Sequence, residues 1–151
     1  MKPVCTLLYQ SPEQLFRSPQ GYNEKADIWS LGCILYELLT GRILFHAAKS
    51  KDQLIDMILH CFGSDEFDTW EEAKKTDVFK AHSHRLKQHK TIWNSIRSQV
   101  PNQKALALLE SLCQLNPNNR PSADLILRHE FFDEIDDECE PAEYIYKFPK
   151  N

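Results

Sequence analysis

The stretch Lys25-Ala-Asp-Ile-Trp-Ser-Leu-Gly-Cys-Ile-Leu-Tyr-Glu-Leu-Leu39, followed by Thr40-Gly41, decides the fold of this 151-residue chain. Its apolar residues occupy more than one face of a helix with 3.6 residues per turn, a pattern typical of a helix that is buried nearly all round. Gly41 stands where a helix often ends in a left-handed conformation. We therefore expect a central helix over residues 25–39, about 22 Å long, that crosses the core of one domain.

The composition indicates a globular intracellular protein: 42% of the residues are hydrophobic and 11% aromatic. No stretch resembles a signal peptide, and the central helix is too short and too polar at its start for a membrane span. A nearly neutral body gives nucleic-acid binding little support. An odd number of widely spaced cysteines without a CxxC pair favours a reducing compartment, the cytoplasm or the nucleus. The cysteines are Cys5, Cys33, Cys61, Cys113 and Cys139.

Capping signals predict further helices and a mainly α fold. Ser11 precedes Pro12 at the start of a short helix. Ser50 and Gln53 form a capping-box pattern before a helix that ends at Gly63, and a weaker helix is expected within residues 64–75. Another helix begins after Pro101-Asn102, and Ser122 caps the last one. In that last segment we expect four side chains to face inward: Leu125, Ile126, Phe131 and Phe132.

Charge is distributed unevenly along the chain. Residues 74–97, from Lys74 to Arg97, contain seven bases and one acid and few aliphatic residues, which predicts a surface excursion. Such a run is most often a solvated loop, and the alternative is a docking site for acidic substrates or partners. Seven acids lie in residues 133–143. We expect residues 135–151 to form a mobile acidic tail that folds over the basic run or keeps the protein in solution.

Three segments, in order, resemble the C-terminal lobe (C-lobe) of a eukaryotic serine/threonine protein kinase. TLLYQSPE at residues 6–13 resembles the end of the activation segment with its A-P-E motif. DIWSLG at residues 27–32 resembles the start of the central helix of that lobe. RPSA at residues 120–123, followed by HEFF at residues 129–132, resembles the close of the domain. The resemblance covers residues 4–132 and is nearest the cyclin-dependent, mitogen-activated and casein-kinase-2-like group.

The resemblance implies structural roles for four residues. Glu13 and Arg120 would form a buried ion pair that holds the activation segment against the lobe. The alternative is an exposed surface pair of little energetic value. Asp27 would accept backbone N–H groups of the catalytic loop, and Trp29 would pack in the core.

It also implies a substrate-binding segment near the N-terminus. Thr6 would hydrogen-bond the catalytic aspartate and lysine of the catalytic loop. Leu7, Leu8 and Gln10 would line the pocket for the substrate residue that follows the phosphorylated one. Proline-directed kinases usually carry arginine at the place of Gln10, so this resemblance argues against proline direction.

The parts that perform phosphoryl transfer are missing from the 151 residues. There is no G-x-G-x-x-G, no H-R-D and no D-F-G, although kinases use these to hold ATP and Mg²⁺. We therefore expect residues 1–134 to be only the C-lobe, with the N-lobe absent and no catalytic, cofactor-binding or metal-binding residue. ATP and Mg²⁺ would belong to a full-length form. The missing helices would leave apolar surface of the central helix exposed.

Three interpretations remain open on the sequence alone. The first is part of a serine/threonine kinase, inactive by itself, whose gene model is cut at an internal methionine. The second is a short, catalytically dead C-lobe that binds the substrates or regulatory subunits of an intact kinase. The third is a degenerate gene product. A metal site is not predicted at His82, His84 or His89, because no carboxylate or cysteine stands at a matching spacing.

Overall fold

The computed structural model describes residues 7–63, 65–85 and 91–133, and every regular element in these ranges is helical. This confirms the mainly α fold expected of a kinase C-lobe. The predicted acidic tail, residues 135–151, and Thr6 lie outside the described residues. The elements are α1 (Pro12–Leu15), α2 (Lys25–Thr40), α3 (Lys51–Phe62), α4 (Glu71–Lys74), α5 (Asp77–His82), α6 (Thr91–Gln99), α7 (Gln103–Leu112) and α8 (Ala123–Ile126), with 3-10 turns η1 (Leu7–Tyr9), η2 (Asp65–Thr69), η3 (Ser83–Arg85), η4 (Pro117–Asn119) and η5 (Glu130–Phe132).

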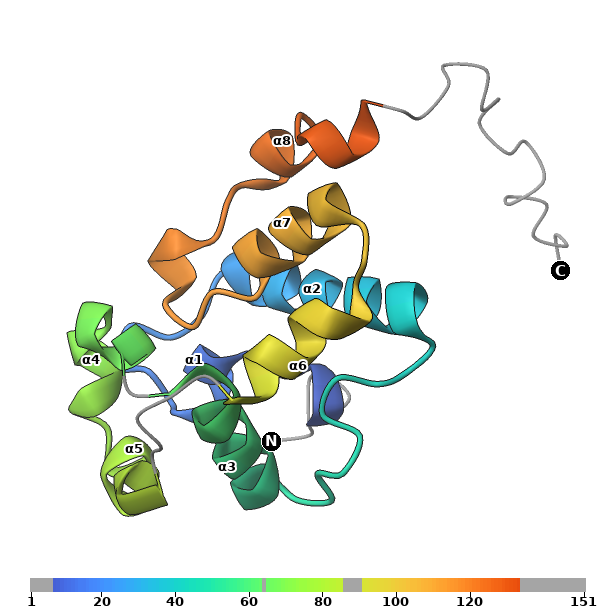
Figure 1. The fold of residues 1–151 in the computed structure, drawn as a ribbon. Helices are drawn as coiled ribbons and strands as arrows, with labels where there is room; N and C mark the ends of the chain where they lie inside the picture. Colours follow the sequence, from blue (N-terminus) through green and yellow to red (C-terminus); the bar gives the residue numbers. More distant parts are fainter. Residues whose placement is uncertain (1–6, 64, 86–90, 134–151) are drawn as a thin grey trace, which may run out of the picture.

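The predicted central helix is α2, and α7 packs along it (Figure 1). A Cβ atom added to Gly32 would lie 2.6 Å from Cys113 Sγ and 3.0 Å from Leu112 Cβ. The missing side chain therefore lets α7 approach closely, which explains a glycine in the interior of a helix that would otherwise disfavour it. Gly41 ends α2 with a φ of 69°, as predicted.

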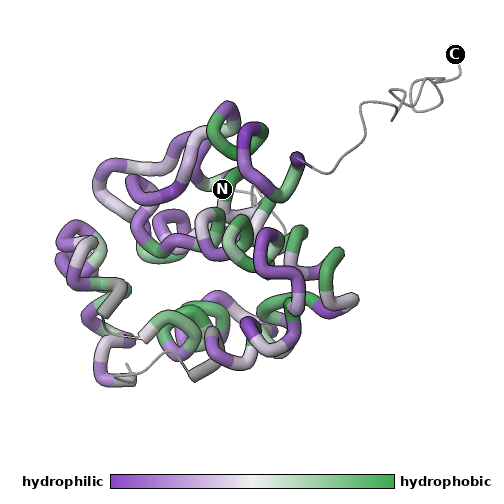
Figure 2. Tube along the Cα trace, turned by 45° about the horizontal axis from the view of Figure 1, so that its top comes forward, coloured by the Kyte–Doolittle hydropathy of each residue, from purple (hydrophilic) through white to green (hydrophobic). Residues whose placement is uncertain are grey.

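Only one face of α2 is buried. Trp29, Cys33 and Tyr36 lie in the main core, whereas Leu31, Ile34 and Leu38 are 42%, 44% and 79% exposed. The prediction of burial all round is therefore wrong, because the described elements cover only one side of α2. On the exposed side, α7 and η5 lie at the edge of the helix and do not cover it. The expectation of exposed apolar surface on this helix is met. Along the helices the tube in Figure 2 alternates hydrophobic and hydrophilic residues.

Aromatic rings fill the core on the side of α1, α4 and α5. Phe16 lies 5.8 Å from both Phe67 and Trp70, measured between ring centroids, and edge-on contacts of this kind are favourable. Phe79 of α5 joins the same cluster at 4.9 Å from Phe67. The expectation that residues 74–97 are a surface excursion is therefore wrong for Phe79 and Ile96, both of which are buried.

The helix caps follow the local rules. Ser50 Oγ accepts from the backbone N–H of Gln53, and Asn102 Oδ1 accepts from that of Ala105, at 3.3 and 2.9 Å. Ser122 Oγ accepts from the backbone N–H of Leu125 at 3.4 Å. The expected helix within residues 64–75 is two short pieces, η2 and α4.

Two details of these segments differ from expectation. The Gln53 side chain reaches the backbone N–H of Lys49 at 2.8 Å, one residue before the cap. Leu125 is 61% exposed, so its predicted inward orientation is wrong, because the single turn of α8 points only Ile126 toward α7. None of the described helices has the length and apolarity needed to cross a membrane.

Candidate functional site

The Glu13–Arg120 ion pair is present and buried. Arg120 Nη1 and Nη2 donate to Glu13 Oε1 and Oε2, both at 2.8 Å, a two-pronged geometry that matches the planar guanidinium to the carboxylate. The side chains are 2% and 0% exposed, for Glu13 and Arg120 respectively. The alternative of an exposed surface pair is therefore wrong. Because α1 carries Glu13, the pair ties the N-terminal segment to the loop that precedes α8.

All five N–H donors of the Arg120 guanidinium have acceptors. Besides Glu13, Nε donates to the carbonyl of Gln114 at 2.7 Å, Nη1 to that of Lys25 at 2.6 Å, and Nη2 to that of Leu115 at 3.1 Å. A buried charge is tolerated when its partners satisfy it completely, and five donors are the full capacity of this side chain. We call Glu13, Arg120 and these three carbonyls the arginine latch.

The arginine latch is joined to the start of α2. Lys25 Nζ donates to the carbonyl of Arg120 at 2.8 Å, so the two residues exchange hydrogen bonds. The guanidinium carbon lies 5.3 Å from the ring centroid of Trp29, within range of a cation–π interaction. Trp29 in turn stacks on Phe45 at 6.2 Å. The predicted packing role of Trp29 is thus confirmed, and its ring also forms one wall of the latch.

The segment expected to bind substrate lies against α2. Ser30 Oγ donates to the carbonyl of Tyr9 at 2.9 Å, and the Tyr9 hydroxyl donates to Glu37 Oε2 at 2.7 Å. That hydrogen bond raises the pKa of Tyr9, because ionising the phenol would remove the donor and place a second negative charge beside Glu37. Two bonds from α2 therefore fix the backbone and the side chain of η1.

The other predicted residues of the site have distinct surroundings. Leu7 and Leu8 are half-buried against the core, while Gln10 is buried. Gln10 Oε1 has no hydrogen-bond partner among the described residues. A buried polar atom left unpaired costs about 1–3 kcal/mol, so this oxygen marks a place where water or another segment would bind favourably. Asp27 is exposed, and no contact of its carboxylate is described.

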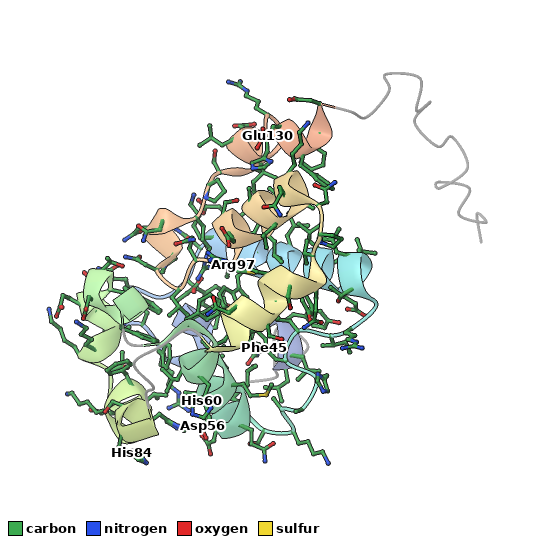
Figure 3. The ribbon with its side chains drawn as sticks, in the orientation of Figure 1. Phe45, Asp56, His60, His84, Arg97 and Glu130 are labelled. Atoms are coloured by element: carbon green, nitrogen blue, oxygen red, sulfur yellow. The ribbon has the colours of Figure 1, made fainter. Side chains whose placement is uncertain are left out.

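The basic run is partly neutralised within the chain. Lys74 Nζ lies 3.1 Å from Asp68 Oδ1 and 2.9 Å from Glu71 Oε1, and Arg97 Nε lies 2.7 Å from Glu110 Oε1. Arg97, labelled on α6 in Figure 3, pairs with Glu110 of α7, whereas the pairs of Lys74 lie within η2 and α4.

A histidine anchors the same part of the chain to α3. His82 Nδ1 lies 2.8 Å from Asp56 Oδ1, and Nε2 lies 3.6 Å from Asp52 Oδ1. Asp56 is labelled on α3 in Figure 3. Much of the basic run therefore serves the fold, and among the cations whose surroundings the structure describes, Lys75 is exposed and has no described ion pair, so it is available to an external acid.

No Mg-ATP site is identified among the described residues. Mg²⁺ in kinases is held by carboxylate and amide oxygens, with the phosphates beneath a glycine-rich loop. Among the described residues no group of three or more histidine, cysteine or acidic side chains is arranged to hold a metal ion. No step of phosphoryl transfer can be derived from this part of the chain.

Comparison with known proteins agrees with the fold. The protein kinase domain family matches residues 1–132, and the chain belongs to this family. A curated relative from Arabidopsis thaliana, described as a probable serine/threonine-protein kinase, is 34% identical over 148 residues. These residues cover 97% of this chain and 24% of the relative, so the chain spans about a quarter of the length of that protein.

Some residues of the site were not found by sequence reasoning. Arg120 exchanges hydrogen bonds with Lys25 and donates to the carbonyls of Gln114 and Leu115, and Tyr9 donates to Glu37. None of these four partners belongs to one of the kinase motifs quoted above. Ser30 lies inside the quoted DIWSLG motif, so a signal existed for it. For Glu37 no local signal exists, because its partner Tyr9 is 28 residues away.

Proposed function

We propose that this chain is the substrate-positioning C-lobe part of a serine/threonine protein kinase of the cyclin-dependent, mitogen-activated and casein-kinase-2-like group. In a full-length form, the ATP γ-phosphate would pass to serine or threonine hydroxyls of a protein substrate. The family match and the relative support the class. The observation that carries the positioning role is the arginine latch, since it joins α1 to the lobe directly after residues 7–10.

The latch supports a division of labour among the residues. Glu13 and Arg120 hold the segment, Ser30 and Glu37 orient Tyr9, and Leu7, Leu8 and Gln10 would face the substrate residue after the phosphorylated one. Thr6 and Asp27 would contact the catalytic loop of a full-length form. Thr6 and Asp27 would not themselves carry out chemistry. We propose that the 151-residue chain neither binds Mg-ATP tightly nor transfers phosphate. It would work in the cytoplasm or nucleus, with a protein substrate or regulatory subunit as its partner.

Two measurements test this proposal. An antibody against residues 74–97 should detect, in a lysate of the source cells, a polypeptide at least about twice the 17.7 kDa of this chain. Purified chain, freed of contaminating kinase, should show no transfer of labelled phosphate from ATP to serine- or threonine-containing peptides. Phosphate transfer by the purified chain would contradict the proposed inactivity, and an endogenous 17.7 kDa band would contradict the full-length kinase.

The second candidate is a catalytically dead C-lobe that competes for the substrates or regulators of an intact kinase. The exposed outer face of α2 favours it, because contiguous apolar surface often marks an interaction site. A 17.7 kDa endogenous band, together with inhibition of an intact related kinase by added chain, would support this candidate. Exposed acids on the partner would be expected to contact Lys75 in the basic run.

A further inference from the structure

The chain between α1 and α2 leaves the core and turns at the surface. Residues 17–24 are exposed except for Ser18, which is half-buried. The carbonyl of Ser18 accepts from the backbone N–H of Gly21 at 2.9 Å, which closes a β-turn over residues 18–21. Pro19 stands at the second position of this turn, where its fixed φ is favoured. The turn therefore presents a serine followed by a proline at the surface.

This serine–proline pair is one of two in the sequence, and the surroundings of the two serines differ. Ser11 precedes Pro12 at the start of α1 and is 0% exposed, two residues before Glu13. Ser18 is only half-buried and precedes Pro19. Proline-directed protein kinases modify a serine that is followed by proline, because the pocket for the next residue holds the proline ring and has no backbone N–H to pair. The fold therefore gives such an enzyme access to Ser18 and denies it access to Ser11.

Backbone strain makes this turn easier to open. Arg17 has a φ of 53°, in the left-handed region, which costs a residue with a side chain about 1–2 kcal/mol. The N–H of Ser18 donates to the carbonyl of Glu13 at 3.0 Å, and the turn adds the bond from Gly21. A kinase binds its substrate in an extended conformation, so residues 17–21 must open locally. Relief of the strain at Arg17 offsets part of the cost of breaking these two bonds, and the core stays intact.

A small polar pocket lies beside Ser18 and has room for a phosphoryl group. Its volume is about 120 Å³, and Ser18, Asn23 and Asn118 are among its lining residues. An added group therefore does not overpack the core, and side-chain amides such as those of the two asparagines can donate to phosphate oxygens. Glu13 also lines the pocket, but both of its carboxylate oxygens are bonded to Arg120.

We propose that Ser18 is a phosphorylation site for a proline-directed serine/threonine kinase. Ser18 Oγ attacks the γ-phosphorus of ATP, the bond from that phosphorus to the β–γ bridging oxygen breaks, ADP leaves, and the hydroxyl proton passes to the catalytic aspartate of that kinase. Gln10 argues against proline direction in a full-length form of this chain, so the modifying enzyme is a different kinase. The inference therefore does not depend on the activity proposed above. The phosphate adds a charge of about −1.5 to −2 at pH 7, next to α1 and the arginine latch.

The test uses the folded 151-residue chain, Mg-ATP and a purified mitogen-activated protein kinase, which is proline-directed. Mass spectrometry of digested samples taken at early times measures phosphate at Ser18 and at Ser11, corrected for a reaction without added kinase. We expect Ser18 to be modified at least about tenfold faster, because access to Ser11 requires opening of α1 and of the arginine latch. An unmodified Ser18, or modification of Ser11 at a similar rate, would overturn the proposal.

Matched variants separate recognition of the serine–proline pair from a general effect on the turn. Pro19→Ala should slow the modification of Ser18 at least about fivefold, because the pocket of the kinase then encloses an unpaired backbone N–H. Gln20→Ala, in the same exposed turn, should leave the rate nearly unchanged. Circular dichroism confirms that each variant is folded. Equal rates in the Pro19→Ala and Gln20→Ala variants would refute recognition of the pair.

Discussion

The two faces of α2 are both apolar but have opposite surroundings. The inner face places Trp29, Cys33 and Tyr36 in the core, beside the arginine latch. The outer face presents Leu31, Ile34 and Leu38 to solvent. Helical periodicity cannot distinguish the two faces, because it depends on the hydrophobicity of the residues and not on which elements pack against them. The comparison teaches that the packing which stabilises the described chain lies on the inner face, whereas the described elements leave much of the outer face uncovered.

The largest contrast is expected between two truncations on the same helix. Trp29→Ala should lower the free energy of unfolding by about 3–5 kcal/mol, because it opens a cavity and removes the ring beneath Arg120. Leu38→Ala should change it by no more than about 0.5 kcal/mol. Urea denaturation followed by circular dichroism measures both. Equal losses would show that the outer face is as well covered as the inner one.

A substitution in the arginine latch that keeps the positive charge sharpens this comparison. Arg120→Lys should cost about 1.5–3 kcal/mol, because an ammonium has three donors on one atom and cannot replace five directed bonds. The same denaturation experiment measures this loss. The matched control is Arg97→Lys in an exposed pair with Glu110, and it should be nearly neutral. A neutral Arg120→Lys would mean that charge alone stabilises the latch.

Close packing of α2 on α7 predicts an effect of smaller size. Gly32→Ala should destabilise the chain by about 1–2 kcal/mol, because overpacking against Cys113 Sγ outweighs the gain in helix propensity. Adding Cys113→Ala to this variant should recover part of the loss, since the nearest atom, at 2.6 Å, is then removed. Thermal unfolding of the single and double variants decides whether that contact is the cause.

Two buried thiols predict how stability depends on pH. Burial raises the pKa of Cys113 from 9.0 to about 12 and raises that of Cys61 as well. In the unfolded chain these thiols ionise near pH 9, so the folded state holds the protons more tightly. Their contribution is present below pH 9 and is lost as the pH rises above it, by about 1.4 kcal/mol per thiol at pH 10. Urea denaturation at pH 8 and pH 10 measures the loss, which should shrink in Cys61→Ala with Cys113→Ala.

The smallest effect is expected at the surface of the basic run. Arg97→Ala should change the free energy of unfolding by about 0–1 kcal/mol, because its pair with Glu110 is exposed to solvent and salt. In 0.5 M salt the difference should vanish. A loss of several kcal/mol would show that Arg97 contributes as much to the free energy of unfolding as the arginine latch.

Local chemistry explains what the sequence could predict. Ser50, Asn102, Ser122 and Gly41 each act within four residues of their partners, so their caps follow from neighbours in the chain. The latch became predictable only through ordered kinase motifs, because no local rule joins Glu13 to Arg120.

Long-range packing accounts for what the sequence could not predict. Phe79 is buried because α5 folds back against Phe16 and Phe67, which a basic run does not signal. The exposure of Leu38 depends on which elements pack against α2, and that information is absent from α2 itself. Tyr9 and Glu37 meet only after the N-terminal segment lies on α2.

The separation of 107 residues between Glu13 and Arg120 has a consequence for synthesis of the chain. Ribosomes add about 5–20 residues per second, so Glu13 is made roughly 5–20 s before its partner exists. During that interval its carboxylate must stay in water, and α1 cannot take its final buried place. The segment of residues 7–13 is therefore expected to be among the last parts of the described lobe to assemble, although it is made before the other described parts.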